Sequence, residues 1–173
     1  MYNTKPWIPL FSQTGSEIAN IIDELDIKPL MIFCNSKANI DLRLFEHNLY
    51  FFNTLKDLEP FKCLLQNNLV TLHGFLRILH ENLITENMYN GHPGLITKYP
   101  ELKGFNPQEK AYQLKLDVTG SVIHKVIPEV DAGEVVLSSE ISIKDLSLDD
   151  VYTNLKQCSL ELWLKFLKEE LKC

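Results

Sequence analysis

Residues 8–34, IPLFSQTGSEIANIIDELDIKPLMIFC, contain the pattern that decides the fold. Two short apolar runs, at 8–11 and 29–34, have the length of buried strands. Between them a polar turn at 12–16 leads into apolar residues at helical spacing, namely Ile18, Ile21, Ile22 and Leu25. A strand, a helix and a second strand in this order form a parallel pair with a right-handed crossover. We therefore predict the opening of an α/β sheet.

The rest of the chain extends this sheet. Strands are predicted at 69–72, 88–90 and 119–126, with 134–143 as an antiparallel hairpin partner of the last; 49–52 is a weaker candidate. Helices are predicted at 55–65 with an interruption at Pro60, at 81–86, at 107–116 and from about Leu148 onward. The last helix carries an apolar stripe typical of a core-facing helix: Leu148, Val151, Leu155, Cys158, Leu162 and Phe166. The expected fold is a Rossmann-like, open, mostly parallel twisted sheet with flanking helices, in a single domain spanning residues 1–173.

The composition narrows the function classes. The chain has 173 residues, a net charge of −6 and a pI near 5.4, which disfavours a general nucleic-acid or anionic-membrane binder. Its first residues lack the apolar core of a signal peptide, and no apolar run approaches the roughly 20 residues that span a membrane, so we expect a cytoplasmic protein. The four cysteines form no Cys-x-x-Cys pair, which favours reduced thiols over disulfides or metal ligands.

Three chemically useful side chains lie beside small or rigid residues. Asn90-Gly91-His92-Pro93-Gly94 supplies an amide and an imidazole, and Val130-Asp131-Ala132-Gly133 supplies a carboxylate. An amide can donate a hydrogen bond to a developing oxyanion, while imidazole and carboxylate move protons, as the transfer of an acyl group to an amine requires. Taken singly, Asn90 and Asp131 are equally typical of structural turn residues.

The order of the motifs resembles that of the folate-dependent formyltransferases, and most closely the branch that acts on glycinamide ribonucleotide. The resemblance rests on Gly74–Leu79, on Asn90–Leu95 with Tyr99–Gly104, and on Gly120–His124 continuing through Val130–Gly133. It runs along nearly the whole chain, is dense between residues 69 and 137 and is thin between 39 and 66, where the chain looks shortened.

The resemblance implies a catalytic set of Asn90, His92 and Asp131, with His124 supporting it from behind. In this family 10-formyltetrahydrofolate gives its formyl group to a primary amine, without a metal. The resemblance also implies a folate site and an acceptor site. The folate site would include Arg77, Ile78, Leu79, Leu83, Val126 and Val130, and the acceptor site Ser12, Gln13, Thr14, Gly15 and Ser16.

The acceptor end departs from the family pattern. Gln13 replaces an expected glycine of the phosphate-binding turn, and Glu17 replaces an expected asparagine and adds a negative charge, for which Lys37 would compensate. The last helix has Gln157–Leu160 where the family places a glutamate that reads ribose hydroxyls, and no carboxylate follows until Glu161. Gly94 and Glu134 also differ from the residues that are usual in the family. Ser12 and Ser16 are expected to cap the helix that follows.

The sequence leaves alternatives open. The acceptor could be an amino sugar nucleotide, a modified nucleotide or glycinamide ribonucleotide. Hydrolysis of the formyl-folate uses the same residue types with water as acceptor, and a catalytically lapsed folate- or nucleotide-binding module is a third interpretation. His47, His73 and His80 are expected at the surface or in supporting positions. The expected partners are therefore the folate donor and a small-molecule amine, with no nucleic acid and no membrane, and a homo-oligomer is compatible with the sequence.

Overall fold

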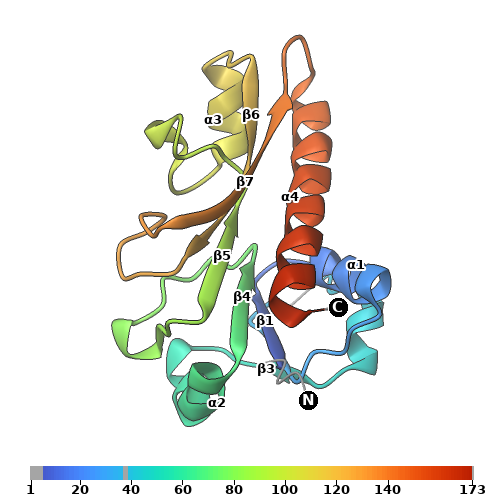
Figure 1. Cartoon of the computed structure of the whole chain (residues 1–173), viewed down its shortest axis with the longest axis vertical. Helices are drawn as coiled ribbons and strands as arrows, with labels where there is room; N and C mark the ends of the chain where they lie inside the picture. Colours follow the sequence, from blue (N-terminus) through green and yellow to red (C-terminus); the bar gives the residue numbers. More distant parts are fainter. Residues whose placement is uncertain (1–5, 37–38, 173) are drawn as a thin grey trace.

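The computed structural model describes residues 6–36 and 39–172, and a single seven-stranded sheet runs through it (Figure 1). The strand order is β3-β2-β1-β4-β5-β6-β7. The strands are β1 (Trp7–Phe11), β2 (Ile32–Cys34), β3 (Leu49–Phe51), β4 (Leu69–His73), β5 (Met88–His92), β6 (Val118–Lys125) and β7 (Val135–Ser142). The first five are parallel, whereas β6 and β7 are antiparallel to their neighbours. The predicted open, mostly parallel sheet is confirmed, including the late antiparallel hairpin.

Helices cover both faces of the sheet. On one face lie α1 (Ser16–Leu25) and the long α4 (Leu148–Leu171). The other face carries α2 (Lys62–Asn67) and the 3-10 turns η2 (Leu55–Phe61) and η3 (Glu81–Leu83). The turns η1 (Leu42–Glu46) and η4 (Pro100–Leu102) and the helix α3 (Pro107–Gln113) complete the fold. No helix within residues 6–36 and 39–172 is long and apolar enough to cross a membrane.

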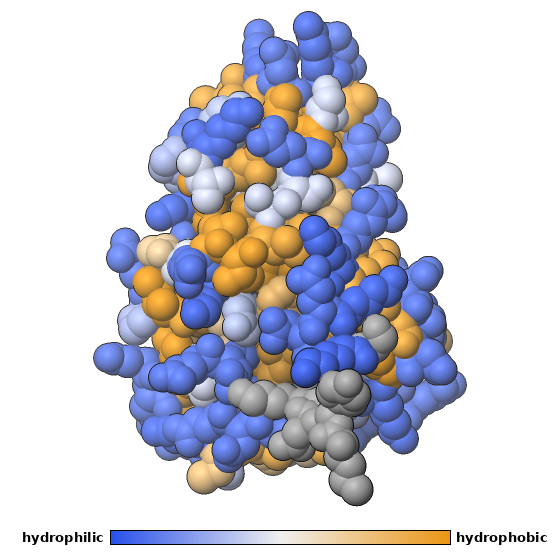
Figure 2. Space-filling model, viewed as in Figure 1, coloured by the Kyte–Doolittle hydropathy of each residue, from blue (hydrophilic) through white to orange (hydrophobic). Residues whose placement is uncertain are grey.

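The core lies on both sides of the sheet, which explains why the early strands are apolar throughout. Trp7 and Phe11 of β1 pack with α1 and α4, whereas Ile8 and Leu10 of the same strand pack with α2 and η2. A parallel strand that is buried on both faces cannot alternate between apolar and polar residues. The apolar stripe of α4 from Val151 to Phe166 is buried as predicted. Figure 2 shows that apolar side chains also gather across the middle of one face of the molecule, between hydrophilic regions.

Several element boundaries differ from those predicted. The helix expected at 55–65 is a 3-10 turn through Pro60 that becomes α2 only at Lys62, because proline lacks the N–H that an α-helical turn needs. The helix α3 ends at Gln113 rather than at residue 116, and Lys115 follows with a left-handed backbone (φ 52°). The turns η1 and η4 were not predicted, because single turns show no hydrophobic periodicity.

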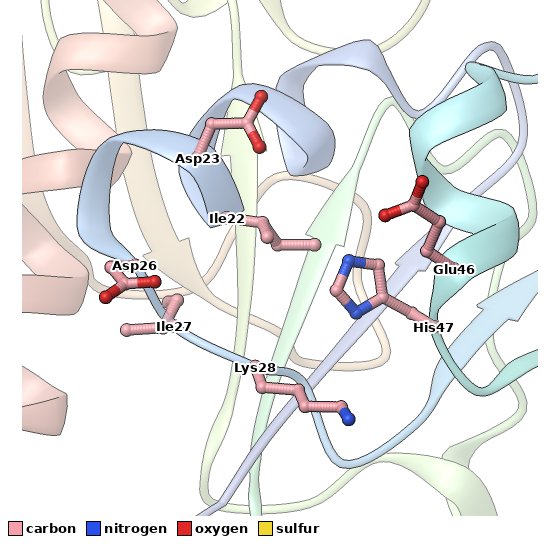
Figure 3. A pocket seen from close by; sticks show the side chains of 7 residues that line it. All are labelled: Ile22, Asp23, Asp26, Ile27, Lys28, Glu46 and His47. Carbon is pink, nitrogen blue, oxygen red and sulfur yellow. The ribbon is translucent and has the colours of Figure 1, made fainter.

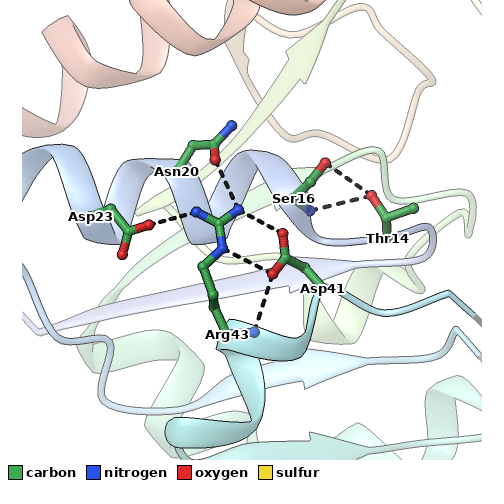
Figure 4. A network of polar contacts seen from close by, with 6 residues as sticks. All are labelled: Thr14, Ser16, Asn20, Asp23, Asp41 and Arg43. Carbon is green, nitrogen blue, oxygen red and sulfur yellow. Dashed lines mark hydrogen bonds and ion pairs between the residues drawn. The ribbon is translucent and has the colours of Figure 1, made fainter.

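A polar network fastens η1 to α1 (Figure 4). The guanidinium of Arg43 donates to Asp41 at 2.6 Å, to Asp23 at 2.5 Å and to the side-chain oxygen of Asn20 at 2.9 Å. The hydrogen bond from Arg43 lowers the pKa of Asp41 below its ordinary value. The main chain also connects the two elements, since the N–H of Asp41 donates to the carbonyl of Thr14. The network thereby anchors the turn that leads into α1.

Candidate active site

The predicted catalytic residues begin on β5, the strand at which the sheet changes from parallel to antiparallel. Asn90 is in register with Leu72 of parallel β4 on one side and with His124 of antiparallel β6 on the other. Asn90 and His92 are two residues apart, so the alternation of a strand places both side chains on the same face. His124 lies on that face beside Asn90 because the two residues are a cross-strand pair.

The loop between β6 and β7 brings Asp131 to this group. Asp131 has a left-handed backbone (φ 50°), a conformation that aspartate adopts more readily than most residues. Gly133 lets the loop lie directly against β6, because a Cβ atom at this position would be 1.8 Å from the carbonyl oxygen of Lys125. Gly133 therefore has a steric function: without a side chain at this position, the loop packs closely enough for Asp131 to contact His92 and His124.

The four side chains form one buried cluster. An Asp131 carboxylate oxygen lies 3.3 Å from Nδ1 of His92, and the other lies 3.4 Å from Nε2 of His124. The side-chain nitrogen of Asn90 is 3.2 Å from Nε2 of His124 and 3.5 Å from Asp131. Only 6% of the His92 side chain, 3% of His124 and 9% of Asp131 are exposed, so these charges interact with little solvent screening. The structure thus brings together all four residues predicted from the motifs.

Backbone carbonyls determine the tautomers of the two histidines. Nε2 of His92 is 2.8 Å from the carbonyl of Leu102, and Nδ1 of His124 is 2.8 Å from the carbonyl of Lys125. A carbonyl only accepts, so each of these nitrogens carries a hydrogen. In the neutral rings the opposite nitrogens are therefore lone pairs: Nε2 of His124 accepts from Asn90, and Nδ1 of His92 faces the Asp131 carboxylate.

The environment shifts two pKa values in this cluster. Burial lowers the pKa of His92, against the attraction of Asp131 that would raise it. Burial works to raise the pKa of Asp131, but the nearby imidazoles of His124 and His92 and the N–H of Gly104 outweigh it, so that its pKa lies below the ordinary value. At neutral pH the cluster therefore holds an ionised Asp131 beside a neutral His92. The Nδ1 lone pair of His92 and the Asp131 carboxylate are both acceptors and repel each other in this buried site. A proton bound between them would remove the repulsion.

Two main-chain groups complete the cluster, and neither was predicted. The N–H of Gly104 donates to Asp131 at 2.8 Å, and the carbonyl of Leu102 accepts from His92 at 2.8 Å. Both come from the segment 99–104, which the sequence marks only through its family resemblance. Backbone donors and acceptors leave no residue-type signature, although the glycine at 104, with a φ of 80°, is the one local signal of an unusual backbone.

The side chains predicted to hold the folate occupy two different environments. Ile78 and Val130 are 69% and 47% exposed and lie on the two loops that flank β5, where a ligand can reach them. Leu79 and Leu83 are buried in the core on the α2 face, and Val126 packs against the same cluster. These three therefore support the two loops from beneath. Arg77 is exposed.

The predicted acceptor turn, residues 12–16, precedes α1 at the same edge of the sheet. Gly15 has a φ of 71° and a Cβ atom there would collide with Leu44 and Phe11, so only glycine fits. The expected capping by Ser12 and Ser16 is wrong. Instead, Ser12 accepts from the N–H of Leu76, and the hydroxyl of Thr14 accepts from the N–H of Ser16. Gln13 lies against Gly74, and Lys37 falls outside the described residues.

Glu17, on the first turn of α1, differs from expectation in having two side-chain partners, of which His73 is buried and Ser159 is half-buried. Its carboxylate is 2.8 Å from Nδ1 of His73 and accepts from the hydroxyl of Ser159 at 2.6 Å. The surface alternative for His73 is therefore wrong, because this side chain is only 2% exposed and lies within the α1 face of the sheet. His80 is exposed as expected.

The hollow in Figure 3 lies away from this chemistry. It is lined by Ile22, Asp23, Asp26, Ile27, Lys28, Glu46 and His47. The segment from Asp26 onward follows the C-terminal end of α1 and leads back to the start of β1, where Leu30 donates to the carbonyl of Trp7. This is the amino end of the parallel strands, whereas ligands of open α/β sheets bind at the carboxyl end, where Asn90 and Asp131 lie.

Comparisons with known proteins agree with the geometry. A sequence model of the formyl transferase family matches residues 33–165. The phosphoribosylglycinamide formyltransferase of Dictyostelium discoideum is 31% identical over 171 residues, a match that covers 78% of this chain and 82% of that protein. The trifunctional purine biosynthetic protein adenosine-3 of Bos taurus is 31% identical over 159 residues, 78% of this chain, but the chain spans only 15% of that protein's length. The crystal structure of phosphoribosylglycinamide formyltransferase from Streptococcus pneumoniae TIGR4 has the same fold, with a TM-score of 0.82 at 22% identity over 95% of this chain and 98% of that chain.

Proposed function

The chain belongs to the formyl transferase family, and from this premise we propose that it moves a formyl group from 10-formyltetrahydrofolate to the primary amine of a small molecule. Asn90, His92 and Asp131 lie at the reacting centre. The observation that carries the proposal is the position of the Asp131 carboxylate, which lies within 3.4 Å of two buried histidines and beside the Asn90 amide.

The reaction needs one oxyanion donor and the transfer of one proton. The amine nitrogen attacks the formyl carbon, and the carbonyl electrons move onto oxygen to give a tetrahedral oxyanion. The bond from the formyl carbon to N10 of the folate then breaks, N10 keeps the electron pair and takes a proton, and the amine nitrogen loses one. The net change is the exchange of a formyl group for a proton between two nitrogens.

Asn90 is placed to donate a hydrogen bond to the oxyanion. One hydrogen of its amide is directed to Nε2 of His124 at 3.2 Å, while the other has only a long contact of 3.5 Å to Asp131. A contact of that length is weak, so this hydrogen can turn to an incoming formyl oxygen at little cost. The first hydrogen bond meanwhile holds the amide in place, which is the preorganisation that makes an oxyanion donor effective.

His92 and Asp131 are placed to take the proton from the attacking amine and to return it to N10 of the folate. Nδ1 of His92 presents a lone pair to the carboxylate, since its Nε2 hydrogen is engaged by Leu102. A proton released by the attacking amine relieves this unfavourable contact by binding between the two groups. The same proton then passes to N10 as the bond to the formyl carbon breaks, so the pair acts first as base and then as acid.

The donor would bind over the loops that flank β5. Leu76, Ile78, Ile127 and Val130 are 59%, 69%, 40% and 47% exposed, which gives an apolar lining at the edge where the catalytic groups lie. A flat heterocycle needs such walls together with a few backbone hydrogen bonds. We include Arg77, Leu79, Leu83 and Val126 in the donor site, the last three as the buried support of these walls.

The proposal is tested first by calorimetry with a non-transferable 10-formyl-folate analogue at neutral pH. We expect a dissociation constant in the micromolar range or tighter, weakened by Leu76→Asp and unchanged by Leu114→Asp; Leu114 is a similarly exposed leucine that follows α3. Formation of tetrahydrofolate is then followed with and without candidate amines. Absence of analogue binding would refute the donor assignment, and equal turnover without any amine would identify water as the acceptor.

A further inference from the structure

Glu17 is part of a network of side-chain hydrogen bonds that is separate from the catalytic cluster. The carboxylate comes from α1, His73 from the end of β4 and Ser159 from the middle of α4. Nδ1 of His73 lies 2.8 Å from one carboxylate oxygen, and the Ser159 hydroxyl lies 2.6 Å from the other. The His73 side chain is 2% exposed, whereas that of Glu17 is 25% exposed. The network is therefore anchored in the core and ends at the surface in a carboxylate.

The direction of each hydrogen bond in this network is determined by its two ends. The indole of Trp7 can only donate, and it donates to the hydroxyl oxygen of Thr71 at 2.7 Å. Thr71 in turn donates its hydrogen to Nε2 of His73 at 2.8 Å, and Nδ1 of His73 donates to the carboxylate. This arrangement satisfies every group with a neutral imidazole. A second hydrogen on His73 would displace the Thr71 hydrogen from its acceptor in a fully buried site.

Two consequences follow. Thr71, His73 and Glu17 are not a hydrolytic triad, because the hydroxyl of Thr71 is fully buried and no substrate can reach it. His73 therefore presents one N–H donor to the Glu17 carboxylate, and Ser159 presents a hydroxyl donor to it. The ring of Trp163 packs on His73 with the ring centroids 4.4 Å apart, and this contact holds the imidazole in one orientation. The carboxylate is therefore a fixed charge rather than a flexible surface group.

The fixed charge lies at the edge of the sheet where the acceptor must approach. His73 directly follows Leu72, which pairs with Asn90 of the catalytic cluster. Glu17 belongs to the first helical turn after the 12–16 segment, where free N–H groups would otherwise bind an anion. One of those groups, the N–H of Ser16, is already engaged by the Thr14 hydroxyl. The turn thus offers the Glu17 carboxylate and the hydroxyls of Thr14 and Ser16 in place of a phosphate cradle.

We propose that Glu17, held by His73 and Ser159, determines which acceptor this enzyme takes: the part of the acceptor at the start of α1 carries hydroxyl or ammonium donors and no phosphate. This proposal rests on the proposed function, since it concerns the acceptor of the same reaction. A carboxylate can accept about four hydrogen bonds, and His73 and Ser159 use two. The remaining positions suit a polyol or an amine, whereas a phosphate dianion would meet the like charge of Glu17.

A binding experiment tests whether the Glu17 carboxylate excludes phosphate, without relying on enzymatic turnover. Inorganic phosphate is titrated into the protein while the amide resonances of Gly15 and Ser16 are followed by NMR. Three proteins are compared: the wild type, Glu17→Gln and the matched control Glu24→Gln, which removes a carboxylate from the exposed side of the same helix. We expect saturable phosphate binding only in Glu17→Gln. Saturable binding by the wild type at millimolar phosphate would overturn the proposal, whatever the variants do.

A kinetic experiment tests specificity directly. Phosphoribosylglycinamide and its dephosphorylated counterpart serve as the two acceptor probes, and the ratio of their kcat/KM values is measured. We expect the wild type to favour the dephosphorylated probe, and Glu17→Gln to shift the ratio toward the phosphorylated probe by about tenfold, which one like-charge contact of about 1.4 kcal/mol would produce. An unchanged ratio in Glu17→Gln would refute the role of Glu17. If neither probe is formylated although the folate analogue binds, these two compounds are excluded as acceptors, and the phosphate titration alone decides whether Glu17 excludes phosphate.

Discussion

Replacing Asp131 by asparagine removes the charge at the centre of the site and changes little else. Asparagine has nearly the same shape and tolerates the left-handed backbone found at this position, where φ is 50°. Its side-chain oxygen can still accept from the N–H of Gly104, which is 2.8 Å from the carboxylate in the wild type. Its amide nitrogen can donate to the lone pair of His124. The loop should therefore remain in place.

The expected loss of activity follows from the proton that Asp131 shares with His92. In the variant, Nδ1 of His92 no longer faces a carboxylate at 3.3 Å, so the pair has a lower affinity for the proton released by the attacking amine. Positioned acid–base groups typically contribute about 10²–10⁴ in rate. We expect kcat to fall by that factor, which corresponds to about 3–5 kcal/mol of activation free energy. The folate site lies on neighbouring apolar loops, so the dissociation constant of the donor analogue should change by less than about threefold, within 0.7 kcal/mol.

The measurement is the pre-steady-state rate of formyl transfer, combined with calorimetric binding of the donor analogue. Asp145→Asn is a matched control, because Asp145 is exposed and also has a left-handed backbone, with a φ of 59°. It undergoes the same chemical change in the same backbone conformation, at a position outside the cluster of Asn90, His92, His124 and Asp131. A rate in Asp131→Asn within about tenfold of wild type would refute the assignment of Asp131 to proton transfer, because a factor of ten is below the usual contribution of such a group.

Three further predictions concern stability. The folded-state pKa of His92 is lowered by burial, so the wild type should lose stability as the pH falls below about 6.5, and His92→Gln should remove that part of the decline in urea unfolding curves. Gly133→Ala should destabilise the fold by about 1–3 kcal/mol and reduce turnover, because the added Cβ would lie 1.8 Å from the carbonyl of Lys125; an unchanged melting temperature would contradict this. Arg43→Met should cost about 1 kcal/mol of unfolding free energy at pH 7 and less near pH 3. The lowered pKa of Asp41 contributes its full stability above the ordinary value of 3.8 and progressively less as the pH falls below it.

The proposed catalytic residues could be predicted from the sequence to different degrees. Asn90 and His92 are two positions apart on a strand that ends at the ligand-binding edge, so their shared face follows from strand alternation alone. His124 follows once β6 is recognised as a neighbour. Asp131, however, is 41 residues from Asn90 in a loop, and only the family resemblance placed it in the site. No local pattern encodes a contact across that distance.

The main-chain partners of the site and the contact between Glu17 and His73 could not be predicted from the sequence. The N–H of Gly104 and the carbonyl of Leu102 bind Asp131 and His92 through atoms that every residue possesses. Glu17 and His73 are 56 residues apart and come from elements that the prediction had placed correctly. The tertiary arrangement decides which face of a helix packs on a given strand residue. A correct secondary structure therefore does not reveal this pair.

The same pair changes the interpretation of the last helix. Along the sequence, α4 lacks the carboxylate that the family places near Gln157–Leu160, which suggests that contact with acceptor hydroxyls has been lost. In the structure, Ser159 of that segment donates at 2.6 Å to Glu17 of α1. A carboxylate is therefore present beside α4, supplied by α1 and held by His73. If the proposed function holds, the groups assigned to formyl transfer stay together while the charge assigned to acceptor recognition comes from a different helix than the sequence comparison suggests, which is the pattern expected of an enzyme that keeps its chemistry and changes its substrate.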